Sequence, residues 1–87
     1  MSRLWPEGER IAVRVQEGGE QPVSFTWQGR GHRLAQVQGR WQVDADWWST
    51  EGRVQRNYWA VTTTSGLLCV LYQDLDKGAW FLAKVYD

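Results

Sequence analysis

Apolar and polar residues alternate with a period of two through the first third of the chain. In the segments IAVRV (residues 11–15) and VSFTW (residues 23–27), every second side chain is apolar. A strand with this pattern buries one face against a core and leaves the other face polar. Gly18 and Gly19 lie between the two segments and suit the positive φ angles of a turn. The pattern therefore predicts two strands joined by a turn.

The pattern is less regular in the next stretch, GHRLAQVQGRWQV. This stretch predicts a strand over residues 32–38, a turn at Gly39 and a short strand over residues 41–43. Leu34 and Val37 are three positions apart instead of two, which predicts a bulge or bend in the first of these strands. Small barrels need such bends to close.

Three further β-rich segments follow, over residues 54–64, 67–73 and 79–86. Short turns separate them, with TSG before the second segment and LDKG before the third. The middle segment, LLCVLYQ, is apolar on both faces, so we expect it to be the central strand of an antiparallel meander.

Six or seven short strands with brief turns predict an all-β fold. The architecture that suits them is a small, strongly bent antiparallel barrel or meander of the SH3-like kind. A chain of 87 residues corresponds to one domain. We therefore expect residues 1–87 to form a single β domain, with residues 1–9 as a less ordered N-terminal arm.

Large aromatic side chains are unusually frequent for a small core, with seven Trp, three Tyr and two Phe. Each buries roughly 150–250 Å² when fully enclosed, so some of them are expected at the surface. Trp27 and Trp41 occupy apolar strand positions and are expected in the core. Trp47 and Trp48 are adjacent, so at least one of them is expected near the surface. The residues predicted to be buried are Val13, Phe25, Trp59, Val70 and Leu82.

The residues that enzymes use are scarce. Cys69, the only cysteine, lies in the apolar run GLLCVLY and is expected to be a buried structural thiol. His32 is the only histidine, and the aspartate pairs at positions 44 and 46 and at positions 74 and 76 lie at predicted turns, where Asp is common. The sequence holds no glycine-rich phosphate loop and no cluster of metal ligands. It therefore indicates a non-enzymatic protein without a metal or a cofactor.

The N-terminal segment MSRLWPEGER has no apolar core of the length that a signal peptide needs. No stretch of the sequence approaches the roughly 20 apolar residues of a transmembrane helix. We therefore expect a soluble, cytoplasmic protein that does not associate with a membrane.

Basic and aromatic residues gather between residues 28 and 58. This region holds five arginines against three acidic residues, although the whole chain has a net charge of zero. Arg stacks on planar groups and forms bidentate contacts, and Trp and Tyr are enriched at binding hot spots. The candidate binding residues are Arg30, His32, Arg33, Arg40, Trp47, Trp48, Arg53, Arg56 and Tyr58.

Several aromatic motifs follow one another along the chain. They are W-x-G from Trp27, the pair Trp47 and Trp48, RNYW over residues 56–59, a turn at Gly66 and WFL over residues 80–82. In this order the motifs resemble the small C-terminal domain of unknown function of ImuB-type proteins, which are catalytically degenerate Y-family polymerase homologues of bacterial translesion synthesis. The resemblance covers roughly residues 10–87 and is to a free-standing version of that domain. It implies an accessory or interaction role.

These features favour two functions. The first is a protein-interaction module of the bacterial DNA-damage response or translesion synthesis. It would bind a protein partner, from the lesion-bypass or recombination machinery, through Trp47, Trp48, Tyr58 and neighbouring arginines. The alternative is a β-barrel that binds single-stranded nucleic acid on the same surface by stacking bases on aromatic rings. The net charge of zero favours the protein partner.

Overall fold

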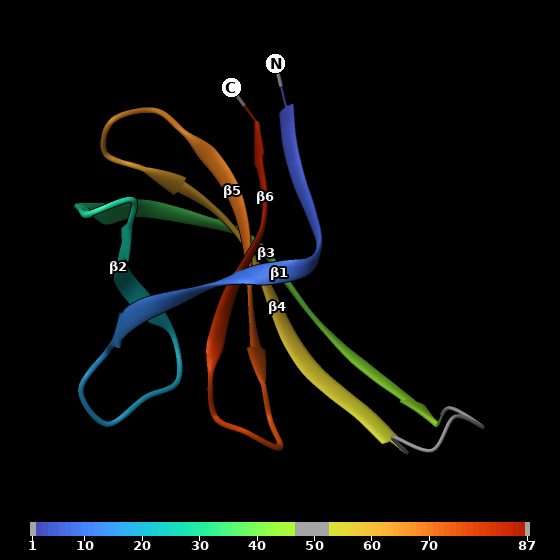
Figure 1. Cartoon of the computed structure of the whole chain (residues 1–87). Coiled ribbons are helices and arrows are strands. Elements are labelled where there is room, and N and C mark those ends of the chain that lie inside the picture. The colour runs from blue at the N-terminus through green and yellow to red at the C-terminus, as the bar shows by residue number, and fades with distance from the viewer. Residues whose placement is uncertain (1, 47–52, 87) are drawn as a thin grey trace.

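Six antiparallel strands form a closed barrel in this computed structural model, which describes residues 2–46 and 53–86 (Figure 1). Each strand pairs with its neighbours in sequence, and β1 closes the barrel by pairing with β6. The strands are β1 (Ser2–Val15), β2 (Pro22–Trp27), β3 (Arg30–Asp46), β4 (Arg53–Thr63), β5 (Leu68–Asp74) and β6 (Trp80–Tyr86). The all-β prediction is confirmed. The described part of the chain contains no helix with the length and apolar character that a membrane crossing requires.

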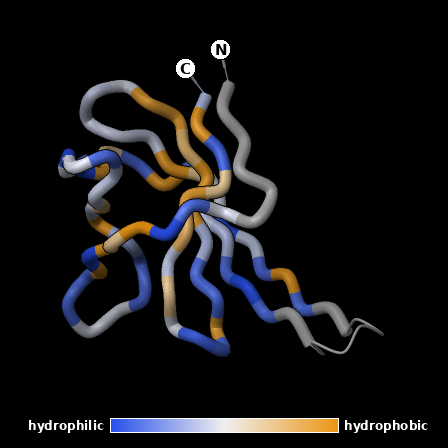
Figure 2. The backbone as a smooth tube through the Cα atoms, in the orientation of Figure 1, coloured by the Kyte–Doolittle hydropathy of each residue, from blue (hydrophilic) through white to orange (hydrophobic). Residues whose placement is uncertain are grey.

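Side chains that point into the barrel form one hydrophobic core. Phe25, Trp59 and Leu82 lie in it, as the alternating pattern predicts. Figure 2 shows apolar residues recurring along the strands, whereas the loop between β1 and β2 is hydrophilic. The buried core residues are Ile11, Phe25, Trp27, Trp59, Val61, Cys69, Leu71, Trp80, Leu82 and Val85.

Val13 and Val70 are only partly buried, so the prediction that both are core residues is wrong. Val70 alternates in β5 with Cys69 and Leu71, which face the interior, and therefore faces outward. Val13 packs against the margin of the core near the end of β1, where Val15 is already 40% exposed. Alternation identifies residues that share a face, but in an all-apolar strand it does not identify the inner face.

β5 is the central strand of the C-terminal meander, as predicted, because it pairs with β4 on one side and with β6 on the other. Its outward side chains are partly covered as well. Tyr72 points to the outside of the barrel and is nevertheless only 3% exposed. The apolar character of both faces of this strand therefore reflects a covered outer face.

β3 runs without interruption over 17 residues, so the predicted turn at Gly39 is wrong. Gly39 pairs with Ala60 of β4 inside the ladder. The register shifts between Leu34 and Gln36 and again between Val37 and Gly39, which confirms the bulge or bend predicted for this strand. Because β4 continues to pair with β3 past Gly39, β3 bends at these bulges and does not reverse its direction as a turn would require.

Residues 2–9, part of the segment for which the sequence predicts an arm, belong to β1. Ser2, Arg3 and Leu4 pair with the end of β6, and the pairing resumes at Glu9 after a register shift. Gly8 lies at this irregularity with a φ of 78°. β1 therefore pairs with β6 in two separate segments.

β3 and β4 extend beyond the barrel as a two-stranded arm (Figure 1). Within the described residues, β2 pairs with β3 only from Arg30 to Arg33, and β5 pairs with β4 only as far as Arg56. The carbonyl of Gln55 still accepts a backbone hydrogen bond of 3.0 Å from Leu75, and beyond Gln55 the described parts of β3 and β4 pair with each other alone. Over most of the length of β3, one of its edges is consequently not paired with any strand that the structure describes.

Candidate binding surface

Four aromatic rings form a continuous row across the outer face of β3–β6. Trp41, Tyr58, Tyr72 and Phe81 lie directly opposite one another in neighbouring strands. Consecutive ring centroids along this row are 5.4, 5.1 and 5.0 Å apart. Cross-strand aromatic pairs each stabilise a sheet by up to about 1 kcal/mol. This aromatic row therefore links the four strands on the outside of the barrel.

Arg56 covers the middle of the aromatic row. Its guanidinium carbon lies 4.6 Å from the ring centroid of Tyr72, and its Nη1 donates a hydrogen bond of 3.3 Å to Tyr58 Oη. Burial by itself would lower the pKa of Arg56. The hydrogen bond to Tyr58 and the Coulombic interactions with Tyr72, Tyr58 and Asp74 outweigh burial, so the pKa is raised above its ordinary value. Arg56 is therefore a permanent positive charge on the outer face.

An apolar groove, the outer groove, lies on the same outer face and shares Trp41 with the aromatic row. It has a volume of about 460 Å³ and is lined by Gln38, Trp41, Ala60, Thr62, Leu68, Val70 and Tyr86. Trp41 from β3 and Tyr86 from β6 stand at its two sides and are 44% and 39% exposed. Between them, the paired small residues Ala60 and Val70 form the floor. The result is a concave apolar surface between two large aromatic side chains.

Trp41 belongs to this surface, so the prediction that it lies in the core is wrong. In β3, Trp41 lies opposite Tyr58 on the outer face, while Arg40 lies opposite Trp59 on the inner face. The guanidinium carbon of Arg40 is 4.6 Å from the ring centroid of Trp59, and its Nη2 donates to Glu20 Oε2 at 3.1 Å. Arg40, a candidate binding residue, is thus on the opposite face of the sheet from the outer groove.

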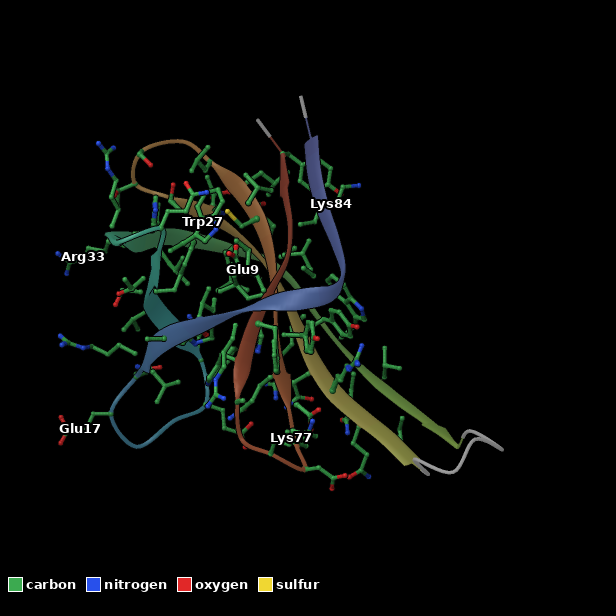
Figure 3. All side chains as sticks on the ribbon, viewed as in Figure 1. Glu9, Glu17, Trp27, Arg33, Lys77 and Lys84 are labelled. Atoms are coloured by element: carbon green, nitrogen blue, oxygen red, sulfur yellow. The ribbon has the colours of Figure 1, made fainter. Side chains whose placement is uncertain are left out.

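Three candidate residues form a separate group at the other end of β3. His32 stacks on Phe25 with 5.0 Å between ring centroids, and Arg30 and Arg33 are exposed beside it. Arg33 precedes Trp41 by about eight residues of extended strand, roughly 26 Å along the chain. Figure 3 shows Arg33 on the side of the barrel away from the β3–β4 arm. These residues therefore do not contribute to the outer groove.

On the outer face, the structure brings together two candidate residues, Arg56 and Tyr58. Trp47 and Trp48 lie outside the described residues, as does the side chain of Arg53. A second groove of about 450 Å³, beside the His32 group, is lined by Arg14, Val23, Ser24, Gly31, His32 and Arg33. The predicted basic and aromatic surface is therefore divided between two places on the barrel.

The model of one protein family matches residues 6–87, which is nearly the whole chain. That family is described as Domain of unknown function (DUF6504). The chain belongs to the DUF6504 family. Comparisons with curated proteins and with solved structures found no match. The family description names no activity and no polymerase, so the link to ImuB-type proteins remains a prediction.

Glu9 and Trp27 of this DUF6504 domain form a polar contact inside the barrel (Figure 3). Trp27 Nε1 donates a hydrogen bond of 2.7 Å to Glu9 Oε2 and so links β2 to β1. Trp27 is 9% exposed, which confirms its predicted place in the core. Since a hydrogen bond to a charged group contributes about 1.5–3 kcal/mol, the contact stabilises the packing of β2 against β1. Among the described residues, no three His, Cys, Asp or Glu side chains form a candidate metal site.

Tyr72, Phe81 and Tyr86 are not among the candidate residues that the sequence suggests for this DUF6504 domain. A signal for them exists in the segment LLCVLYQ, because a strand that is apolar on both faces indicates that side chains cover its outer face. The identity of the covering residues depends on the register between strands. That register is a property of the folded barrel.

Proposed function

We propose that this chain is a non-enzymatic interaction module that binds a protein partner in the outer groove. The observation that carries the proposal is an apolar floor between two exposed aromatic side chains, Trp41 and Tyr86. Aromatic residues around a desolvated pocket dominate the binding energy at protein interfaces. The small side chains of Ala60 and Val70 leave room for an apolar side chain of the partner.

The charges around the outer groove favour a protein over single-stranded nucleic acid. Nucleic-acid binding depends on several Lys or Arg side chains that neutralise phosphates. Near the groove, Arg56 is already stacked on Tyr72 and Lys84 on Tyr86. The arginines of the β2–β3 hairpin lie at the other end of β3, and the net charge of zero adds no general attraction to a polyanion.

The environments of Cys69 and His32 support a non-enzymatic role. Cys69 has no solvent exposure, and His32 is stacked on Phe25. A catalytic nucleophile needs both an adjacent base and access to a substrate. Neither side chain combines these two properties.

The resemblance to the C-terminal domain of ImuB-type proteins supports a particular kind of partner. We place the interaction in the bacterial DNA-damage response, with a protein of the lesion-bypass or recombination machinery in the cytoplasm. The assignment to this pathway depends on the aromatic motifs of the sequence. The outer groove supports binding of a protein partner but does not favour one pathway over another.

Substitution of the groove walls tests the proposal. Proteins that bind the immobilised chain are captured from source cells treated with a DNA-damaging agent, identified, and purified for affinity measurements. Trp41→Ala and Tyr86→Ala are each expected to weaken binding by at least about 2 kcal/mol, or roughly 30-fold. Leu75→Ala is the matched control, because Leu75 is an apolar residue, 38% exposed, that does not line the groove. Equal affinities for the wild type and both groove variants would contradict the proposal.

A titration with a fluorescent single-stranded oligonucleotide tests the alternative. If nucleic acid is the ligand, its affinity falls steeply with salt as counterions are released. Absence of binding by the wild type at low salt removes this alternative. Tight, salt-sensitive binding that is lost in Trp41→Ala and in Arg56→Ala would overturn the preference for a protein.

A further inference from the structure

The free edge of β3 is the largest unpaired backbone element in the described part of the chain. No described strand pairs with the side of β3 that faces away from β4 beyond Arg33. From Gly39 to Asp46 the pairing with β4 shows no register shift. This stretch also contains neither Pro nor Lys, which commonly protect exposed edges from pairing with another chain. We refer to residues 39–46 as the β3 edge.

We propose that two copies of this chain pair antiparallel through their β3 edges, about a two-fold axis at Gln42. A two-fold interface uses the same surface on both copies, so each residue must be compatible with its symmetry mate. An axis at Gln42 places Arg40 opposite the partner's Asp44, and Trp41 opposite the partner's Val43. Gln42 lies opposite the partner's Gln42.

The faces of β3 are consistent with this register. Arg40 and Asp44 lie opposite Trp59 and Gln55 of β4, on the inner side of the sheet. Residues directly opposite in an antiparallel pair share a face, and their Cβ atoms are about 4.5–5.5 Å apart. Arg40 and the partner's Asp44 can therefore form an ion pair, and symmetry repeats this pair once more in the dimer.

The outward-facing residues of the β3 edge are also compatible with their symmetry mates in this register. Trp41 and Val43 lie opposite Tyr58 and Arg56 of β4, on the outer face. Trp41 is 44% exposed, and pairing with the partner's Val43 would cover part of its ring. Aromatic and β-branched residues are a favourable cross-strand combination. Both faces of the β3 edge are thus self-complementary in one register.

Neighbouring registers lack this complementarity. An axis at Trp41 would place Arg40 opposite the partner's Gln42, and an axis at Val43 would place Gln42 opposite the partner's Asp44. Only the axis at Gln42 brings Arg40 and Asp44 together. Arg40 already binds Glu20 through Nη2, but a guanidinium has five N–H donors and can contact a second carboxylate. The ion pair is separate from the outer groove, because Arg40 and Asp44 lie on the other face of β3, whereas the pairing of Trp41 with the partner's Val43 involves one wall of the groove.

Charge reversal across the edge tests the dimer. Arg40→Asp and Asp44→Arg each place like charges opposite one another, twice per dimer. The wild type is expected to convert from monomer to dimer in sedimentation velocity between low-micromolar and sub-millimolar concentrations. Each single variant is expected to raise the dimer dissociation constant by about tenfold or more. The double variant restores opposite charges at the same positions and is expected to recover dimerisation.

Arg33→Asp is the matched control, because Arg33 is an exposed arginine of β3 that lies outside the β3 edge. It is expected to dimerise as the wild type does. If loss of the Arg40 guanidinium from the ring of Trp59 destabilises the fold, Asp44→Arg still tests the dimer, because it leaves Arg40 in place. Circular dichroism checks the fold of each variant. A wild type that stays monomeric at every concentration overturns the proposal. So do single variants that dimerise like the wild type, and so does a double variant that fails to recover.

Discussion

Trp59 combines a buried ring with an unpaired polar atom. The residue is 3% exposed, its ring centroid is 6.5 Å from that of Trp80, and Arg40 lies over its ring. Among the described residues, its Nε1 is buried without a hydrogen-bond partner. A buried donor without a partner costs about 1–3 kcal/mol. The aromatic ring, and not the indole N–H, is therefore what stabilises the barrel at this position.

Two substitutions at Trp59 separate these contributions. Trp59→Ala is expected to lower the free energy of unfolding by about 3–5 kcal/mol, the range for removal of a large buried aromatic. Trp59→Phe retains a ring and removes the unpaired donor, so its cost is expected to stay below about 2 kcal/mol. Urea unfolding followed by far-ultraviolet circular dichroism measures both. A Phe variant as unstable as the Ala variant would show that the indole N–H of Trp59 contributes a stabilising hydrogen bond.

At the scale of the strands, β1 passes very close to the aromatic row at Gly8. A Cβ atom on Gly8 would lie 2.7 Å from Tyr72 Oη and 2.8 Å from Phe81 Cβ. The φ of 78° also lies in the left-handed region, which residues with a side chain rarely adopt. Gly8 therefore allows β1 to change register against β6 and to cover Tyr72 at the same point.

Gly8→Ala is expected to destabilise the barrel by about 2–5 kcal/mol, because left-handed strain adds to the steric clash. Gly29→Ala is the matched control. Gly29 has a φ of 74°, but no atom lies within 4 Å of the position of its Cβ. Its substitution is expected to cost only the conformational term of about 1–2 kcal/mol. Thermal and urea unfolding compare the two variants, and equal losses of stability would show that β1 does not pack closely on the aromatic row.

For the whole molecule, the pairing pattern predicts a stable barrel and a less protected arm. The central residues of β5 are paired on both sides, whereas β3 beyond Arg33 is paired with β4 alone within the described residues. Local opening is easiest where few buried contacts and few interstrand hydrogen bonds must be broken. The arm should therefore open independently of the barrel.

Amide hydrogen exchange in dilute solution measures this difference. Amides at Val61, Leu71 and Leu82, which have no solvent exposure, are expected to exchange most slowly and close to the rate of global unfolding. Amides of residues 42–44 that point to the β3 edge are expected to exchange about 100-fold faster or more. Edge amides as slow as those of β5 in dilute, monomeric protein would be the contrary result.

The sequence alone was sufficient for the strands and for part of the candidate surface. Its period of two places Phe25 and Trp59 on core faces, and the spacing of Leu34 and Val37 predicts the bulge in β3. Arg56 and Tyr58 are two positions apart in one strand, so alternation places them on one face, where the structure shows them hydrogen-bonded. These features depend on residues close together in the chain, and local backbone geometry determines them.

Only the tertiary structure decided the features that depend on register and curvature. Alternation shows that Trp41 and Val43 share a face but not that this face is the outer one, and the continuation of β4 past Gly39 replaces a predicted turn with a paired strand. Tyr72 and Tyr86 reach the candidate surface from other strands. A shift of one residue between strands would turn each of these side chains to the opposite face. The aromatic row and the outer groove therefore exist only once the barrel has closed in a single register.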